Sequence, residues 1–272
     1  MQQPGSHPFL SAGRPLAFAH RGGAAAWPEN TLLAFRNAVE SGCDVIETDL
    51  RLTQDEALVV LHDERVDRTT NGRGPLAGLT LAAVQRLDAA YWFSRDGQSF
   101  PLRDQGISVP TFEEAIAVTP GVCWNVELKG RNPRLADVLW KVIDRHGMHH
   151  RILVAAHFDP LVRRFRRLCG NRVATAAGFR ESTVFFASSR LRLLRLLQPR
   201  FRALQLPVRY RGLKVVDARL LRDAHALGLA VHVWTVNETT EMEALLRLGV
   251  DGLMSDHPAR LVATLRAARK KA

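Results

Sequence analysis

The 272-residue chain is poor in the features that mark secreted and membrane-spanning proteins. Its cysteines are few and odd in number, and they lie inside apolar segments, at Cys43, Cys123 and Cys169. This placement is typical of buried free thiols in a reducing cytoplasm and does not favour disulfides or a cysteine metal site. No stretch approaches about 18 consecutive apolar residues, so no membrane span is predicted. The N-terminus has no basic region followed by an apolar run, so no signal peptide is predicted either. We therefore expect a cytoplasmic protein.

Acidic residues are scarce over residues 163–222, where sixteen Lys and Arg face only Glu181 and Asp217, within a chain of net charge +11. A solvated helical surface would explain this basic region. The alternative is a basic face that attracts phosphate-bearing substrates or an anionic membrane. Basic and apolar residues alternate over 188–202, which suits an interfacial helix and a core-facing amphipathic helix equally. There is no aromatic interleaving and no zinc pattern, so nucleic-acid binding is not predicted.

Strand and helix patterns alternate almost from end to end of the chain. Eight core strands are predicted, beginning near residues 15, 43, 122, 151, 172, 202, 229 and 250. Helices are predicted over 30–42, 133–147, 159–169, 181–197, 217–228, 238–249 and 258–271. Such strand–helix units imply a parallel sheet, and eight of them at this length favour an α/β fold of the (β/α)8 TIM-barrel type over an open sheet. We expect one barrel domain over residues 1–272, with an added strand at 57–62 and an insertion over about 64–107 after the second strand.

Polar side chains gather where the predicted barrel strands end. In a (β/α)8 barrel the carboxyl ends of the strands meet at one opening, which holds the active site. The residues in question are His20 and Arg21 after the first strand, Glu47 and Asp49 at the end of the second, His62 on the added strand, Glu127 and Lys129 on the third, Trp234 on the seventh and Asp256 after the eighth. Their convergence predicts a catalytic site at this opening.

Glu47, Asp49 and Glu127 supply three carboxylates from adjacent strands. Carboxylate oxygens are the ligands that Mg²⁺ and Ca²⁺ prefer, and an ion would relieve the repulsion among them. The alternative is a salt-bridge network with nearby cations, namely Arg21, Arg51 or Lys129.

The basic and aromatic side chains suggest acid–base chemistry on an anionic substrate. His20 and His62, on either side of one centre, could act as base and acid. Arg21 could clamp a phosphate group with its guanidinium or pair with a carboxylate. Lys129 could contact an anionic substrate oxygen or an acid, and Trp234 could line an apolar part of the substrate or pack in the core.

Several segments together resemble the glycerophosphodiester phosphodiesterase family. They are "AHRGG" and "PENTLLAFRNAVESGCDVIETDLRLTQDEALVVLHDERVDRTTNG", then "VPTFEEAI", "NVELKG" and "VHVWTVNETTEMEALLRLGVDGLMSDHP". The similarity extends over residues 16–266, and the ordered His-Arg-Gly, Glu-x-Asp and His-Asp elements are specific to the family. It implies a barrel of the phospholipase C-like phosphodiesterase type with an insertion after the second strand.

The resemblance also implies roles for the site residues. Glu47, Asp49 and Glu127 match the metal ligands, His20 and His62 the acid–base pair, and Arg21 and Lys129 the phosphate-contacting positions. The family cleaves glycerophosphodiesters to glycerol 3-phosphate and an alcohol, with a metal-activated glycerol hydroxyl that attacks to form a cyclic phosphate. Which histidine is the acid and which the base stays open.

Two positions depart from the family pattern. His157-Phe158 replaces a Ser-Phe pair, which leaves the head-group preference open, and Ser255-Asp256 replaces Thr-Asp. The leading hypothesis is a metal-dependent glycerophosphodiesterase acting on small soluble diesters. The alternatives are a lysophospholipase D-type phosphodiesterase acting on membrane lysolipids and a non-catalytic module that binds phosphate ligands or membranes. The oligomeric state is not predicted.

Overall fold

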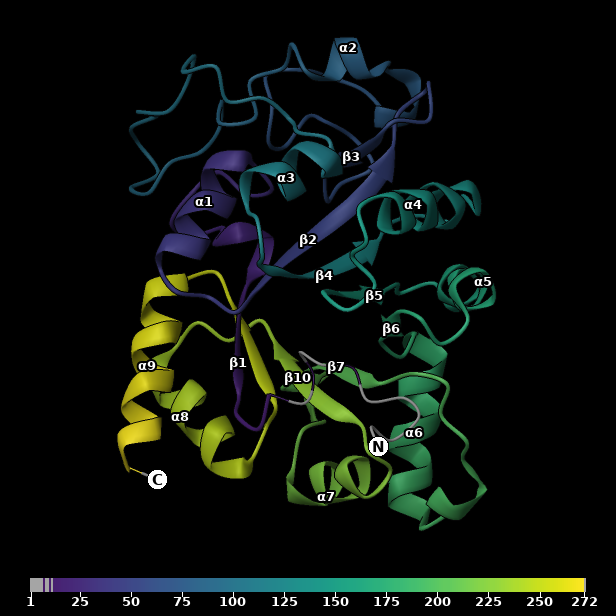
Figure 1. The fold of residues 1–272 in the computed structure, drawn as a ribbon. Coiled ribbons are helices and arrows are strands. Elements are labelled where there is room, and N and C mark those ends of the chain that lie inside the picture. Colours follow the sequence, from purple (N-terminus) through teal and green to yellow (C-terminus); the bar gives the residue numbers. More distant parts are fainter. Residues whose placement is uncertain (1–6, 8–9, 11, 272) are drawn as a thin grey trace.

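The computed structural model describes His7, Leu10 and residues 12–271. Within these residues, eight parallel strands form the barrel that the sequence predicts (Figure 1). They are β1 (Leu16–Ala19), β2 (Val45–Leu52), β4 (Cys123–Leu128), β5 (Ile152–Ala155), β6 (Ala174–Thr175), β7 (Ala203–Pro207), β10 (Ala230–Trp234) and β11 (Gly252–Ser255). Their order is β6-β5-β4-β2-β1-β11-β10-β7, and a parallel bridge between Ala176 and Ala203 closes the ring.

Helices lie around the outside of this ring (Figure 1). They are α1 (Leu32–Glu40), α3 (Phe112–Val118), α4 (Arg134–Arg145), α5 (Asp159–Cys169), α6 (Phe179–Leu191), α7 (Ala218–Ala226), α8 (Thr239–Leu248) and α9 (Pro258–Lys271). Local sequence sets several of their starts. The Thr31 hydroxyl accepts from the Ala34 N–H, and Thr111 and Glu114 form a capping box at α3. In the described residues no helix is long and apolar enough to cross a membrane.

The predicted insertion follows the second strand and forms a small layer of its own. β3 (Leu58–Val60) pairs antiparallel with β2, and beyond it lie the 3-10 turn η3 (Leu76–Gly78) and the short helix α2 (Leu81–Val84). A separate apolar cluster, which includes Val66, Leu76 and Val84, holds this layer together over one side of the barrel mouth (Figure 1).

The structure differs from the sequence prediction in several elements, among them α3, which was not predicted. Glu47 and Asp49 lie in the middle of β2, not at its end, because pairing with β3 extends β2 to Leu52. The helix predicted over 181–197 ends at Leu191, where Arg192 takes a left-handed conformation with φ 60°. A short hairpin, β8 (Arg209–Tyr210) and β9 (Leu213–Lys214), follows β7 and was not predicted.

The main core lies between the strands and the helices around them. Trp124 of β4 is fully buried and meets the rings of Phe35 and Phe112 edge-on at 5.2 and 5.3 Å between ring centres. Cys43 and Cys169 are buried and Cys123 half-buried, and all three are free thiols. Burial raises the pKa of Cys43 to about 12, so its thiol stays protonated at neutral pH.

Candidate active site

The three predicted carboxylates come together inside the barrel mouth. Glu47 and Asp49 share one face of β2, and Asp49 lies opposite Glu127 of β4 in the parallel register. One oxygen from each of the three side chains lies within 4.8 Å of one oxygen from each of the others. Three carboxylate oxygens at this spacing form a donor set that suits a hard divalent cation.

Burial opposes ionisation of the carboxyl groups in this cluster. Burial and the neighbouring Asp49 raise the pKa of Glu47 to about 7. Burial alone would also raise the pKa of Asp49, but Lys129 and Arg21 overcome it and hold that pKa below its ordinary value. Arg21 and Lys129 thus do not fully neutralise the negative charge of the cluster. A bound cation would therefore favour the ionised form of the Glu47 side chain.

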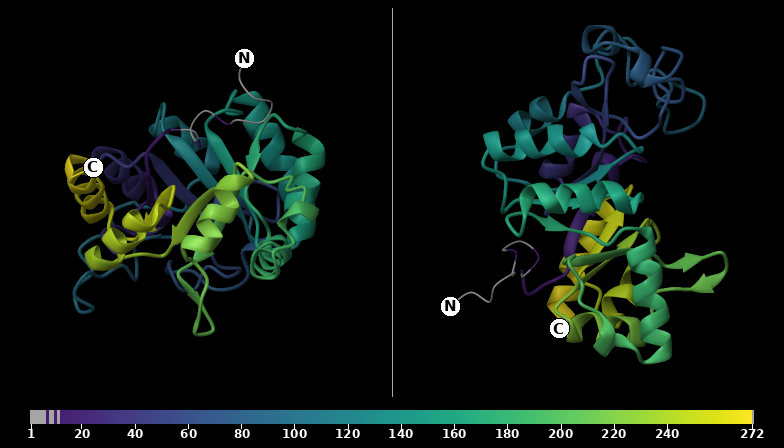
Figure 2. Two further views of the ribbon diagram at one scale, coloured as in Figure 1. Left: turned by 90° about the horizontal axis from the view of Figure 1, so that it is seen from below. Right: turned by 90° about the vertical axis from the view of Figure 1, so that its right-hand side faces the viewer.

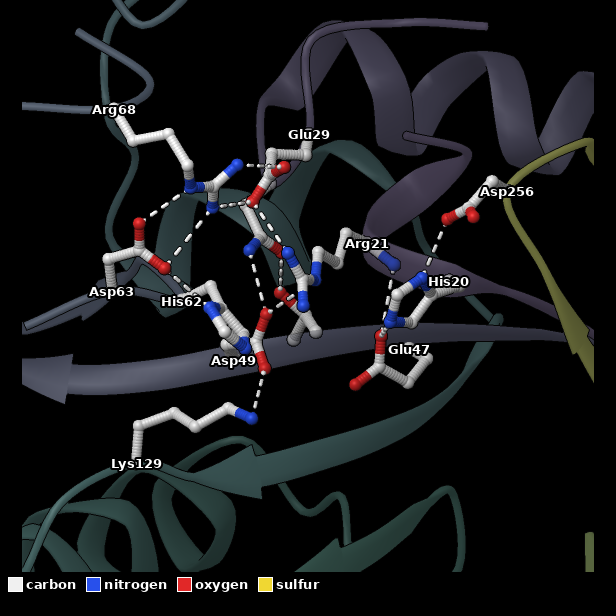
Figure 3. Close-up of polar contacts among 12 residues, drawn as sticks. His20, Arg21, Glu29, Glu47, Asp49, His62, Asp63, Arg68, Lys129 and Asp256 are labelled. Carbon is white, nitrogen blue, oxygen red and sulfur yellow. Dashed lines mark hydrogen bonds and ion pairs between the residues drawn. The ribbon is translucent and has the colours of Figure 1, made fainter. Parts of the chain in front are cut away.

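His20 lies beside the cluster at the end of β1 (Figure 3). Its Nδ1 contacts Asp256 Oδ1 at 2.7 Å, and its Nε2 lies 3.9 Å from Glu47 Oε2. The Asn237 amide donates to Asp256 Oδ2 at 2.8 Å and so fixes that carboxylate. Burial disfavours the charged imidazole, but Asp256 and Glu47 outweigh it and raise the pKa of His20 above 6.5. The Asp256 contact leaves the Nε2 of His20 as the ring nitrogen that faces the site.

His62 is held in the same way by a carboxylate on the other side of Asp49 (Figure 3). Its Nδ1 contacts Asp63 Oδ1 at 2.6 Å. Arg68 donates to both carboxylate oxygens of Asp63, from Nε at 2.6 Å and from Nη2 at 3.2 Å. Burial opposes ionisation of Asp63, but Arg68 and His62 overcome it and lower its pKa to about 2. Both histidines therefore have a carboxylate on Nδ1, an arrangement that fixes the orientation of the ring.

Arg21 and Lys129 contact the carboxylates as well as facing the site. Arg21 Nε lies 3.3 Å from Asp49 Oδ2, and its Nη1 donates to Glu29 at 3.0 Å. Lys129 Nζ lies 3.2 Å from Asp49 and 2.8 Å from Glu127. The salt-bridge alternative is thus present in the structure together with the clustered carboxylates. Both cations stand where they could also meet a phosphate.

A tight turn after β1 places Arg21. The 3-10 turn η2 (His20–Gly22) holds Arg21 at φ 50°, which is uncommon for a residue with a side chain, and its N–H donates to Glu47 at 3.0 Å. Gly22 follows at φ 79° with Ala34 so close that an added Cβ would lie 2.8 Å from the Ala34 side chain. The sequence His-Arg-Gly therefore lets the backbone press against α1 and aim His20 and Arg21 inward.

The remaining predicted residues lie at the rim of the barrel. Trp234 ends β10, is 43% exposed, and stands opposite Pro207 in the strand register. The exposed His157 follows β5, and its ring packs on Phe179 with 5.0 Å between ring centres. In the described part of the chain no salt bridge joins Arg51 to the carboxylate cluster, and its Nε donates to the His62 carbonyl at 2.9 Å.

Some of the arginines in the basic region over 163–222 pair with acidic side chains, and others line a cavity. Arg166 pairs with Glu181 and Arg190 with Asp217. A cavity of about 920 Å³ lies between α5, α6 and residues 197–202, and several of its arginines have no acid partner in the described part of the chain. None of the carboxylates of the cluster lines this cavity, so it is distinct from the site at the barrel mouth.

Comparison with known proteins agrees with this geometry. A statistical description of the family named Glycerophosphoryl diester phosphodiesterase family matches residues 20–260. The chain belongs to this family. Among its relatives is the Mycobacterium tuberculosis protein named Probable glycerophosphodiester phosphodiesterase 2, which is 35% identical over 253 residues, 91% of this chain and 89% of the relative. A glycerophosphodiester phosphodiesterase of Caldanaerobacter subterraneus is 29% identical over 93% of this chain and 98% of its own.

Solved structures of the phosphodiesterase family share the fold. The glycerophosphoryl diester phosphodiesterase domain of Mycobacterium tuberculosis Rv2277c superposes with a TM-score of 0.81 at 21% identity, over 93% of this chain and 99% of that domain. A phosphodiesterase of Oleispira antarctica, in complex with its product sn-glycerol-3-phosphate, superposes with a TM-score of 0.75 at 24% identity, over 94% and 99% of the two chains. At these identities the likeness establishes the barrel fold.

The structure adds supporting residues that the sequence analysis gave no role. Glu29 accepts from Arg21 at 3.0 Å and from both terminal nitrogens of Arg68 at 2.8 Å, so it links the two arginines (Figure 3). Asp63 is the carboxylate that holds His62, and Asn237 donates to Asp256, the carboxylate that holds His20. The only sign in the sequence that Glu29 and Asp63 matter was their position within segments that resemble the family. Their partners became identifiable only in three dimensions.

Proposed function

We propose that the chain hydrolyses glycerophosphodiesters to glycerol 3-phosphate and an alcohol with a divalent metal ion. The observation that carries this proposal is the arrangement of His20 and His62, each with a carboxylate on Nδ1, on either side of Asp49 in the three-carboxylate cluster. The product held by the Oleispira antarctica phosphodiesterase supports the substrate class. Membership of the phosphodiesterase family supports the reaction type.

In this proposal Glu47, Asp49 and Glu127 hold the ion, Mg²⁺ or Ca²⁺. Their oxygens lie within 4.8 Å of one another, and Glu47 needs a nearby positive charge to ionise fully at neutral pH. A divalent ion bound there would polarise the phosphoryl group and lower the pKa of the glycerol hydroxyl.

The two histidines would move the protons. One takes the proton from the glycerol hydroxyl as its oxygen bonds to phosphorus. The other gives a proton to the departing alcohol as the bond between phosphorus and that alcohol breaks. The product of this step is a cyclic phosphate, which water then opens with the proton transfers reversed. Asp256 and Asp63 support the imidazolium that forms on either histidine.

The remaining roles concern binding. Arg21 and Lys129 would contact the phosphate oxygens, because both already lie against Asp49 and present additional N–H donors. Trp234 would line the part of the opening that receives the leaving alcohol, since its ring is 43% exposed at the end of β10. We further propose that residues 1–272 form one domain and act in the cytoplasm, which the three free thiols support.

The test is a panel of glycerophosphodiesters assayed for glycerol 3-phosphate release with Mg²⁺, Ca²⁺ or EDTA. We expect EDTA to abolish turnover and one of the ions to restore it. Full activity in EDTA would contradict the metal assignment.

Single variants test the residue roles. Glu47→Ala and His20→Ala should each lower turnover by about 10²-fold or more, while circular dichroism shows a folded protein. Glu56→Ala is the matched control, because Glu56 is 51% exposed and, among the residues that the structure describes, pairs only with Arg134, outside the site. A Glu47→Ala variant as active as the control would contradict the assignment.

A second substrate class, the lysolipid at a membrane, is favoured by a specific feature of the barrel rim. Exposed apolar and basic side chains gather beside the site, on the hairpin formed by β8 and β9.

A further inference from the structure

The hairpin formed by β8 and β9 extends away from the barrel at residues 209–214. Both views in Figure 2 show it projecting beyond the helices. All six of its residues are exposed, with Tyr210 at 45% and Leu213 at 57%. Arg211 (φ 49°) and Gly212 (φ 82°) form its two-residue turn, and two positive φ angles are the signature of the tight turn that suits a twisted hairpin.

The hairpin is anchored at its base and has little support along its length. Val215 and Val216 are buried, and the Val215 N–H donates to the Val208 carbonyl at 3.0 Å. Beyond this base, the Tyr210 ring lies 6.2 Å from Phe179 between ring centres. A two-stranded hairpin without a packed face is marginally stable in water. An exposed tyrosine and leucine on such a projection therefore indicate a surface that packs against something else.

The position of the hairpin relates it to the active site. It begins two residues after the carboxyl end of β7, at the same end of the barrel as the carboxylate cluster. Phe179, which is 43% exposed, opens α6 next to Tyr210. Trp234 stands opposite Pro207 at the foot of the hairpin. Phe179, Tyr210 and Trp234 thus place exposed apolar side chains along one side of the barrel mouth.

The charge of the hairpin identifies the partner that it fits. Arg209, Arg211 and Lys214 lie within six residues, and residues 208–216 contain no acid. Within the described part of the chain none of these three side chains pairs with a carboxylate. The next acid, Asp217, is engaged by Arg190 at 2.7 Å and caps α7. Exposed tyrosine and leucine between unpaired cations match the interface of an anionic bilayer, which takes apolar side chains at the headgroup level and attracts basic ones.

We propose that the hairpin at 209–214, with Phe179 beside it, docks the barrel mouth on anionic membranes. The site would then meet glycerophosphodiesters that are the head groups of lysophospholipids embedded in the bilayer. This second part rests on the proposed phosphodiesterase function, whereas the docking does not.

The experiment is co-sedimentation of the full chain with vesicles of phosphatidylcholine alone and of phosphatidylcholine mixed with phosphatidylglycerol, in EDTA. The wild type should bind the mixed vesicles and not the neutral ones. Tyr210→Ser/Leu213→Ser should abolish this binding by removing the apolar contact. Absence of wild-type binding, or equal binding to both vesicles, would overturn the proposal and leave the hairpin as a contact for an acidic protein.

A matched pair of charge variants locates the effect. Arg209→Gln/Arg211→Gln/Lys214→Gln should weaken binding on the order of 100-fold, because each basic residue near an anionic surface contributes a factor of about five. Arg266→Gln/Arg269→Gln/Lys270→Gln removes the same charge at the end of α9. There Arg269 donates to Pro15, which precedes β1 at the opposite end of the barrel. If the two triple variants lose binding equally, net charge and not the hairpin is responsible, and the proposal fails.

Activity measurements separate the docking from the catalysis. The hairpin variants should cleave soluble glycerophosphoethanolamine at the wild-type rate and long-chain lysophosphatidylethanolamine in mixed vesicles at least tenfold more slowly. Equal loss on both substrates, or no loss on the vesicle-borne one, would overturn the lysolipid assignment. If the wild type turned over neither, the proposed function would fail, while sedimentation in EDTA would still report on the docking.

Discussion

Glu29 is the carboxylate on which two arginines of the site converge, and replacing it with glutamine isolates its charge. The side chain is 14% exposed and accepts three hydrogen bonds, one from Arg21 at 3.0 Å and two from Arg68 at 2.8 Å. Glu29→Gln keeps the shape and one acceptor oxygen. It leaves the guanidinium groups of Arg21 and Arg68 close together without the negative charge of Glu29 between them.

The expected cost follows from this geometry. A hydrogen bond to a charged group contributes about 1.5–3 kcal/mol. Arg68 is 48% exposed, so solvent screens its share, and the amide retains part of the bonding. We expect Glu29→Gln to lower the free energy of unfolding by about 2–3 kcal/mol at neutral pH. Glu56→Gln is the matched control, because Glu56 and Arg134 are both 51% exposed and such pairs contribute at most about 1 kcal/mol.

The pH dependence gives a second, independent signature. Burial would raise the pKa of Glu29, but Arg68 and Arg21 overcome it and hold the pKa below its ordinary value of 4.5. A carboxyl group whose pKa is lower in the folded than in the unfolded protein contributes stability above the unfolded pKa. That contribution disappears as the pH falls through the folded value. The difference between wild type and Glu29→Gln should therefore be largest at neutral pH and shrink below about pH 4.5.

Urea unfolding in EDTA, followed by tryptophan fluorescence, measures both effects, since no bound ion then adds to the stability. A cost of Glu29→Gln no larger than that of Glu56→Gln at neutral pH would show that the Glu29 charge does not stabilise the fold. A cost that stays constant on acidification, over the range in which both proteins remain folded, would show the same.

Two further predictions test the barrel interior and the His20 pair. In Gly252→Ala the new Cβ would lie 2.5 Å from the buried Phe18 ring, so the free energy of unfolding should fall by about 1–3 kcal/mol in urea titrations. Gly78→Ala has no neighbour closer than 3.8 Å, and a similar loss there would contradict the steric reason. Asp256→Asn removes a charge that raises the pKa of His20, so the limb of the pH profile of kcat/KM that reports His20 should move to lower pH. A limb that stays in place would show that Asp256 does not tune His20.

The parts of the fold that the sequence predicted are those with local causes. The helix expected over 159–169 has those bounds in the structure, because Pro160 suits its first turn and Gly170 follows its end. The alternation of strands and helices fixed the barrel, and the barrel in turn brought Glu47, Asp49 and Glu127 together.

Other features depended on contacts that leave little trace in the sequence. The hairpin at 209–214 has strands of two residues each, too short for an alternating pattern. The α6 helix ends at Leu191 through a left-handed Arg192, although the apolar and basic residues continue in a helix-like pattern. Glu29 and Arg68 are 39 residues apart, and a pair at that separation forms only when the insertion folds over the barrel mouth.

Strand periodicity and helix caps act over a few residues, so the amino-acid sequence alone specified the barrel, the insertion and the set of polar residues that meet at the barrel mouth. The tertiary structure alone decided which acid supports each histidine, that Arg21 and Lys129 share the charge of Asp49, and that an apolar, basic hairpin stands beside the site. These outcomes depend on distances between side chains from separate elements, and such distances arise only when the chain closes into the ring.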